Sequence, residues 1–226
     1  MIKCSSCARV QEPRLLCAEC GAPLGAALDL FAALGLARKL TLDLARLEQI
    51  YHDLGRRIHP DRFASGAAKL RDASLRGTAL LTRAYRTLRD PVSRGLYWLE
   101  LNGHKLAENN KSVPADLAEM VFKVQEQLAD LREARGGGGE AADQLRGEIE
   151  DRRVKLHRAI ELAQHALAQN FERWDVLPDV HGDQPDADRD KRAALVAELK
   201  SHLSEIAYLT TLIRDIDREL DSAQAA

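Results

Sequence analysis

Apolar side chains recur at spacings of three and four residues along almost all of the chain that follows residue 28. A first stripe consists of Leu44, Leu47, Tyr51, Leu54 and Ile58. A second stripe, richer in small residues, consists of Leu70, Ala73, Gly77, Leu81, Ala84 and Leu88. Residues at these spacings share one face of an α-helix, and small residues let a partner helix approach closely. The pattern predicts an all-α fold class that includes two antiparallel amphipathic helices.

Helix boundaries around this pair can be assigned from a few residues. Pro60 ends the first stripe, because proline lacks the backbone N–H that a helix needs. Asp90-Pro91 has the composition of a helix start. The short helix that follows is expected to end at Asn102-Gly103, which is typical of a left-handed C-terminal turn. Residues 30–36 predict a further short helix, so one short helix precedes the two amphipathic helices and one follows them.

The second half of the chain carries three longer apolar seams. Their members are, in order, Leu117, Met120, Val124, Leu128 and Leu131; Leu145, Ile149, Leu156, Ile160, Leu167 and Phe171; and Leu195, Leu199, Ile206, Leu209, Ile213, Ile216 and Leu220. Four glycines at 136–139 and a segment rich in Pro, Asp and Gly at 178–185 separate the seams. The pattern predicts an elongated antiparallel three-helix bundle. The glycine run lacks the features of a phosphate loop and is interpreted as a turn.

The composition excludes several classes of protein. Of the 226 residues, 45% are hydrophobic and 30% are charged, so the chain can bury a core. A formal net charge of −2 argues against a protein that mainly binds nucleic acid or an anionic membrane. No apolar run approaches the roughly 20 residues of a membrane-spanning helix, and no signal-peptide pattern begins the chain. We therefore expect a soluble, cytoplasmic protein without nucleic-acid or membrane partners.

Residue types that carry catalysis do not gather in a recognisable pattern. Nothing in the sequence places a nucleophile beside a base, and the seven histidines form no HExxH pair. The carboxylates follow the expected helix surfaces instead of clustering near apolar segments. We expect a binding module, not an enzyme, and no organic cofactor.

All four cysteines lie in the first 20 residues, as two CxxC pairs formed by Cys4 with Cys7 and Cys17 with Cys20. Two such pairs can bring four thiolates around one metal ion, and Gly21 suits the tight turn after the second pair. Disulfides are disfavoured without a secretory signal, and a redox CxxC usually lies at a strand-to-helix junction that is not indicated here. We predict one structural zinc site, with iron as the alternative metal.

The most informative loop is His59-Pro60-Asp61, which lies between the two amphipathic helices. Alone the tripeptide is weak, since Pro stops a helix and Asp caps the next turn. Its position after a basic-faced helix and before an antiparallel partner resembles a J domain, by which co-chaperones stimulate ATP hydrolysis on DnaK-type chaperones. The segments HPDRFASG and AYRTLRDPVSRGLYWLELNG are similar to the HscB type of J-domain co-chaperone, which serves iron–sulfur cluster assembly. Longer members of that family also carry an N-terminal tetracysteine segment.

The resemblance implies three domains with different roles. Residues 1–24 form the metal-binding ribbon, residues 28–101 the J domain, and residues 113–222 a C-terminal three-helix bundle. The family is not enzymatic. Its members stimulate a DnaK/HscA-type chaperone ATPase through the J domain and deliver an iron–sulfur cluster scaffold protein through the bundle.

The resemblance also assigns residues to the chaperone-binding face. His59, Pro60 and Asp61 would engage the ATP-bound chaperone and trigger hydrolysis. Arg56, Arg57 and Arg62 would pair with carboxylates of the chaperone. Exposed Arg side chains steer an acidic partner, and proline reduces the entropy lost when the loop is ordered on binding.

The family binds its scaffold protein through apolar and acidic residues on the first and last bundle helices. The positions that match are Met120, Phe122, Glu126 and Tyr208. Met120 also fits the apolar core seam, and Phe122 or Tyr208 could simply cover the bundle.

Three residues depart from the family pattern. Lys123 stands where the family tends to be acidic, Ala118 where it has a larger apolar residue, and Thr82 where it has Asn. A J-domain protein with a different client is therefore one alternative. A zinc-ribbon adaptor for nucleic acid is another, but it predicts a basic ribbon with aromatic residues. Residues 1–24 hold three basic residues and no aromatic residue.

Overall fold

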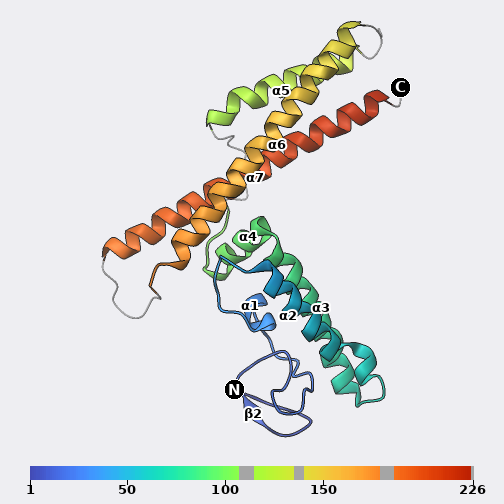
Figure 1. The fold of residues 1–226 in the computed structure, drawn as a ribbon, viewed down its shortest axis with the longest axis vertical. Helices are drawn as coiled ribbons and strands as arrows, with labels where there is room; N and C mark the ends of the chain where they lie inside the picture. The colour runs from blue at the N-terminus through green and yellow to red at the C-terminus, as the bar shows by residue number, and fades with distance from the viewer. Residues whose placement is uncertain (107–114, 135–139, 179–185, 225–226) are drawn as a thin grey trace. The chain divides into compact units, whose positions relative to one another are not determined.

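The computed structural model describes residues 1–106, 115–134, 140–178 and 186–224. These residues contain seven α-helices, one 3-10 helix and one two-stranded sheet (Figure 1). The predominantly helical fold confirms the fold class predicted from the apolar periodicity. The chain divides into two compact units, which we call unit 1 (Met1–Trp98) and unit 2 (Leu99–Ala226).

Unit 1 contains the helices expected around the His-Pro-Asp loop. They are α1 (Leu30–Leu34), α2 (Leu44–Ile58), the 3-10 helix η1 (Pro60–Phe63), α3 (Ala68–Arg89) and most of α4 (Pro91–Leu101), whose last three residues belong to unit 2. Aspartate side chains cap three of the helix starts. Asp29 accepts a hydrogen bond from the Ala32 N–H at 2.8 Å, and Asp43 and Asp90 do the same for N–H groups three residues ahead of them. Gly103 has φ 72°, which confirms the left-handed turn predicted after α4.

The core of unit 1 forms where α2 and α3 pack against each other. The buried Ile58 side chain fills the space that a side chain at Gly77 would occupy. The Ser74 hydroxyl donates to the Ile58 carbonyl at 2.6 Å, and the rings of Tyr51 and Tyr85 stack with centroids 4.2 Å apart. Small residues on α3 thus permit the close approach that the sequence predicted.

All five members of the first predicted stripe lie in α2, but they are not all buried. Leu44 is exposed, and the buried face of α2 begins at Leu47. The reason is positional, since Leu44 is the first residue of α2 and directly follows the Asp43 cap. Apolar spacing identifies a helical face but does not show where the neighbouring helix ends.

The N-terminal ribbon is held by few backbone contacts. Strands β1 (Ile2–Lys3) and β2 (Val10–Gln11) pair antiparallel, with Ile2 opposite Gln11. An isolated bridge joins Leu16 to Pro23. Leu15 and Leu16 lie between the cysteine pairs and are buried.

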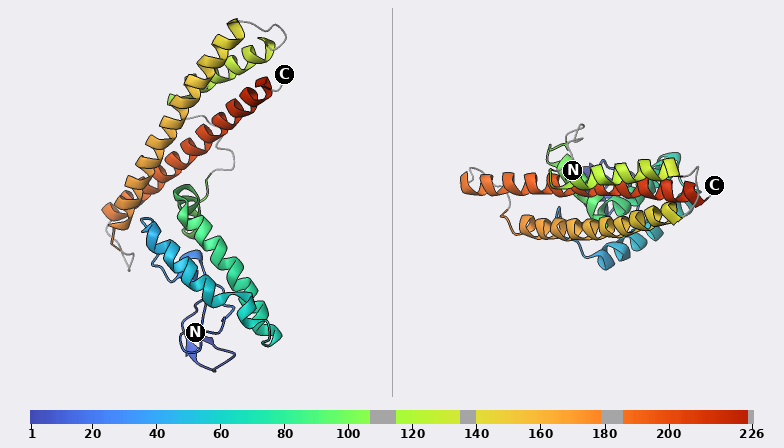
Figure 2. Two further views of the ribbon diagram at one scale, coloured as in Figure 1. Left: turned by 45° about the vertical axis from the view of Figure 1, so that its right-hand side comes forward. Right: turned by 90° about the horizontal axis from the view of Figure 1, so that it is seen from above.

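Unit 2 consists of α5 (Ala115–Ala134), α6 (Glu140–Asp175) and α7 (Asp186–Gln224). Helices α6 and α7 run side by side and α5 packs against both (Figure 2). The core contains members of all three predicted seams, including Val124, Ile149, Leu156, Leu209 and Ile216. The four-glycine turn at 136–139 and the connector at 179–185 lie outside the described residues. No helix among the described residues has the length and apolar character needed to cross a bilayer.

The Gly77 contact gives a stability prediction. A Cβ on Gly77 would lie 2.3 Å from Ile58 Cδ1, whereas a Cβ on Gly55 of α2 would meet no atom within 4 Å. Overpacking typically costs 1–3 kcal/mol, and Gly to Ala in a helix gains about 1 kcal/mol. We expect Gly77→Ala to lower the free energy of unfolding by about 1 kcal/mol and the control Gly55→Ala to raise it by about 0.5–1 kcal/mol.

Denaturant unfolding of both variants beside the parent chain tests this expectation. Shortening Ile58 to Val in the Gly77→Ala background should recover part of the loss. Equal stabilisation by both alanines would contradict the close approach of α2 and α3.

Candidate functional site

Four cysteine sulfur atoms converge in the N-terminal ribbon. The Sγ atoms of Cys4, Cys7, Cys17 and Cys20 all lie within 4.8 Å of one another. Cys4 Sγ is 3.7 Å from Cys20 Sγ, and Cys7 Sγ is 3.7 Å from Cys17 Sγ. A tetrahedral zinc ion with Zn–S bonds of about 2.3 Å places its sulfurs about 3.8 Å apart. The four thiols therefore fit one zinc ion, and their separations are too long for disulfide bonds.

The two cysteine pairs have matching backbone geometry. In each pair the residue after the second cysteine has a positive φ, 60° at Ala8 and 71° at Gly21. The N–H of that residue donates to the carbonyl of the first cysteine at 3.0 Å in both cases. Each pair thus closes a tight knuckle that turns its two sulfurs toward the same point. Glycine was expected at the second knuckle, whereas Ala8 adopts the same conformation with a Cβ.

The thiols hold their protons unequally because they lie so close together. The Cys20 backbone N–H, acting against burial and aided by the Gln11 amide, lowers the pKa of Cys17 to about 6. The Arg9 backbone N–H also acts to lower the pKa of Cys7, but partial desolvation and the neighbouring thiols together raise it to about 12, although Cys7 is exposed at the surface. A divalent cation among the sulfurs favours loss of all four protons, because metal ligands must be deprotonated. The donor set suits a closed structural site.

The His-Pro-Asp tripeptide lies at the turn between α2 and α3. His59 ends α2, and Pro60 begins η1 at the position where a missing N–H costs least. The His59 Nδ1 atom accepts a hydrogen bond from the Asp61 N–H at 3.3 Å and lies 3.4 Å from Asp61 Oδ2. The Asp61 side chain is 88% exposed. The His59 ring therefore holds the Asp61 backbone N–H, and the Asp61 carboxylate is left accessible to a partner.

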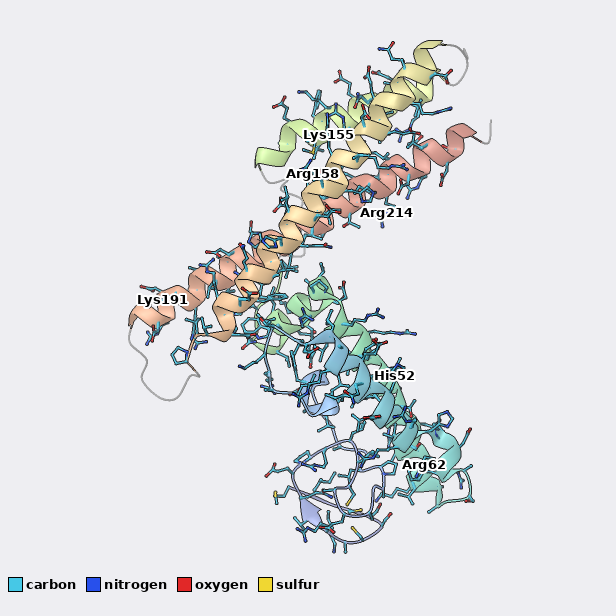
Figure 3. The ribbon with its side chains drawn as sticks, viewed as in Figure 1. His52, Arg62, Lys155, Arg158, Lys191 and Arg214 are labelled. Carbon is cyan, nitrogen blue, oxygen red and sulfur yellow. The ribbon has the colours of Figure 1, made fainter. Side chains whose placement is uncertain are left out.

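The three arginines expected to accompany the tripeptide are all exposed. Arg62 follows Asp61 in η1 and lies on the surface (Figure 3). Arg56 pairs with Asp53 on the same helix, so a partner carboxylate would compete with that contact. Arg57 lines a pocket with Leu54 and Cys17. Of the six predicted chaperone-binding residues, five are exposed and Pro60 is partly buried.

Beside the tripeptide is a groove that the sequence analysis missed. Its volume is about 590 Å³, and its lining consists of Pro60, Leu75, Thr78, Ala79, Thr82, Arg83, Arg86 and Thr87. The sequence signal for this groove was Leu75, an apolar residue that lies outside the apolar stripe of α3 and is exposed. Thr82, one of the departures from the family pattern, lies in this groove.

The four predicted scaffold-binding residues occupy two settings in unit 2. Met120 and Tyr208 are partly buried and pack against the same core cluster. Phe122 is 69% exposed, and Glu126 is exposed one helical turn further along α5. The core-packing interpretation of Met120 is consistent with its place in the structure. Of these four residues, Phe122 is the apolar one that is most exposed to solvent.

Comparison with known proteins decides the family. A curated protein of Bordetella avium described as a co-chaperone protein HscB homolog is 34% identical over 155 residues, which cover 66% of this chain and 90% of the relative. Relatives with the same description from Bordetella pertussis and Chromobacterium violaceum are 34% and 29% identical over 136 and 133 residues. These matches cover 60% and 58% of this chain, and 78% and 76% of the relatives. The chain belongs to the HscB co-chaperone family.

Solved structures of HscB proteins share the fold. Human co-chaperone protein HscB aligns with a TM-score of 0.61 at 23% identity, covering 95% of this chain and 96% of that one. The chaperone HscB from Vibrio cholerae aligns with a TM-score of 0.60 at 20% identity, covering 86% and 99%. No protein-family model matches the chain. The relatives and the solved structures together confirm the resemblance to HscB proteins that the sequence indicated.

Two further departures from the HscB pattern lie on α5. Lys123 pairs with Glu119 one turn back, and this ion pair lowers the pKa of the Glu119 carboxyl. Ala118 is exposed.

The sulfur geometry predicts the metal content of this HscB-family protein. We expect about one zinc ion per chain, because the four thiols fill a closed tetrahedral site. The double change Cys17→Ser, Cys20→Ser removes half of the ligands and should abolish binding. Elemental analysis of the purified chain measures both.

Ala18→Ser is a matched control, because it adds a hydroxyl to the same knuckle and keeps every thiol. It should retain about one zinc ion. Iron with visible absorption, or a parent chain without metal, would show that the assignment to zinc is wrong.

Proposed function

We propose that the chain is a non-enzymatic J-domain co-chaperone that supports iron–sulfur cluster assembly. The observation that carries the proposal is an exposed His59-Pro60-Asp61 loop between antiparallel helices, in a chain that belongs to the HscB family. The ribbon at residues 1–24, the J domain at residues 28–101 and the bundle at residues 113–222 divide the task. Its partners are a DnaK/HscA-type chaperone and an iron–sulfur cluster scaffold protein.

On the chaperone-binding face, Asp61 is the residue whose contact with the chaperone triggers ATP hydrolysis. Its carboxylate is exposed and held near His59, and Pro60 restricts the backbone between them, so little entropy is lost on docking. Arg57 and Arg62 contribute exposed cations on either side of the tripeptide. Such cations raise association rates with an acidic surface, and salt weakens their effect.

The tripeptide gives the decisive test of this face. Replacing His59, Pro60 and Asp61 by three alanines should leave the helix content unchanged, because their side chains lie outside the buried core. Stimulation of a DnaK-type ATPase should fall at least about tenfold, since about 1.4 kcal/mol of lost interaction already has that effect. Circular dichroism and single-turnover ATP hydrolysis measure the two properties.

The single change Asp61→Asn removes only the charge and should reproduce most of the loss. Asp151→Asn removes an exposed carboxylate from α6 and serves as the control, with parental stimulation expected. Full stimulation by the three-alanine variant would remove the J-domain interpretation.

For the scaffold protein, we propose a surface on unit 2 formed by Phe122 and Glu126 of α5 with Met120 and Tyr208. Two aspects of the structure support it. Phe122 presents a large apolar side chain to solvent, and a Glu follows one turn later. The cluster that holds Met120 and Tyr208 joins α5 to α7, so both ends of the proposed surface have a common support. Aromatic side chains that become buried when a partner binds dominate the binding energy of many interfaces.

A pull-down with the scaffold protein tests this surface. The double variant Phe122→Ala, Tyr208→Ala should weaken binding by about 30-fold or more, as expected when hot-spot contacts worth about 2 kcal/mol are lost. Phe122→Ala alone avoids any loss of core packing and should account for much of the effect.

Leu162→Ala is the matched control, because Leu162 is 67% exposed on α6 outside the proposed surface. Its binding should equal that of the parent. If the double variant binds as tightly as the control, the scaffold docks elsewhere or the client is a different protein.

A further inference from the structure

The N-terminal ribbon packs directly on the first turns of α3. Leu70 packs against the cluster formed by Cys4, Cys17 and Ala22. One turn further, a Cβ on Gly25, the residue directly after the ribbon, would lie 3.5 Å from Ala73 Cβ. The third close approach is at Gly77, where the Cδ1 atom of Leu15 lies 3.4 Å from the position of a Cβ. Leu70 and Gly77 of the small-residue stripe on α3 therefore face the ribbon, and Ala73 between them faces the residue that follows it.

These contacts reach both ends of the His-Pro-Asp loop. At one end, Leu15 and Ile58 meet over Gly77, and Ile58 directly precedes His59. At the other end, Leu70 lies 3.9 Å from the Cβ position of Gly66, whose N–H donates to the Phe63 carbonyl at 2.9 Å. The loop is thus bracketed by two residues, Ile58 and Leu70, that share contacts with the ribbon.

The loop itself has weak internal support. The side chains of η1 are exposed or only partly buried. The Arg62 N–H donates to the His59 carbonyl at 3.0 Å, but the bond from Ala64 to Asp61 is 3.4 Å long. Segments with few buried contacts and exposed hydrogen bonds open at low free energy. The conformation of Asp61 therefore depends on what holds the loop ends.

The ribbon, in turn, depends on its metal site. Its regular structure amounts to two-residue strands and one isolated bridge. A segment this small folds when a metal binds, because the binding free energy supplies its folding free energy. Leu15 lies two residues before Cys17, and Cys17 itself forms part of the surface that Leu70 covers. Metal binding thus creates the surface that α3 packs against.

We propose that Leu15 and Leu70 are positioning residues through which the metal-loaded ribbon fixes the His59–Asp61 loop from both ends. This inference rests on the proposed co-chaperone function. Loss of metal then lowers stimulation of the chaperone although the tripeptide and its arginines are unchanged. Because coupling between sites is reciprocal, truncating Leu15 or Leu70 also weakens metal binding, although neither residue is a ligand.

Hydrogen exchange on the full-length chain measures the coupling without the chaperone. The amides of Arg62, Ala64 and Gly66 are compared in zinc-loaded protein and after removal of zinc by a chelator. We expect their exchange to accelerate at least about fivefold without zinc, the lower end of coupling between sites. Amides in the second half of α3 should change much less, which separates the effect from general unfolding of unit 1.

Four variants give the test its specificity. Leu15→Ala and Leu70→Ala should show fast exchange at these amides even with zinc bound, a smaller further increase on chelation, and weaker zinc affinity in competition with a chromophoric chelator. Leu15→Met restores side-chain volume and should recover most of the coupling. Leu44→Ala shortens an exposed leucine at the far end of α2 and should behave as the parent.

ATPase stimulation by the same proteins distinguishes failure of the coupling inference from failure of the proposed co-chaperone function. Unchanged exchange at Arg62 and Ala64 after chelation would overturn the inference, and so would parental zinc dependence in both alanine variants. A zinc-loaded parent that fails to stimulate the ATPase would instead contradict the proposed function, while the exchange measurement still reports on the coupling. Accelerated exchange together with lower stimulation in Leu70→Ala supports both the coupling and the proposed function. The same two effects in Leu15→Ala, with recovery in Leu15→Met, would support them further.

Discussion

The contact between Gly77 and Ile58 holds α2 and α3 together, and the presentation of the His-Pro-Asp loop depends on it. With no side chain at Gly77, Ile58 enters the surface of α3, and the Ser74 hydroxyl satisfies the carbonyl at the end of α2. A buried carbonyl left unpaired would cost about 1–3 kcal/mol, so this bond stabilises the end of α2 that Pro60 sets. The tripeptide begins at the next residue. A loop made of exposed polar groups is therefore placed by apolar packing beneath it.

The two proposed interaction surfaces differ in their physical chemistry. The chaperone-binding segment at 56–62 is charged and exposed, which favours fast association and sensitivity to salt. The surface around Phe122 has an exposed aromatic beside a carboxylate and depends more on desolvation. The two proposed surfaces lie in separate compact units. That separation is what an adaptor between two proteins requires.

Helix boundaries followed from the sequence because their causes are local. Pro60 ends α2 at Ile58 through its missing N–H, and Asp90 caps the start of α4 at Pro91, as the sequence predicted. The docking of the ribbon on α3 did not follow, because it depends on tertiary contacts between short segments. Leu15-Leu16, two adjacent apolar residues between the cysteine pairs, were the available signal. The proposed scaffold-binding residues were chosen by resemblance to the HscB family, since periodicity alone assigns Met120 to the core.

The two cysteines of each knuckle differ in their access to solvent. Cys4 and Cys17 are buried, whereas Cys7 and Cys20 are exposed. A reagent attacks sulfur fastest where it can reach a thiolate. In the metal-free ribbon these two properties are separated, because neighbouring thiols help to raise the pKa of the exposed Cys7, whereas the Cys20 backbone N–H lowers the pKa of the buried Cys17. Neither of these thiols combines access with a low pKa, so both resist modification better than an exposed low-pKa cysteine would.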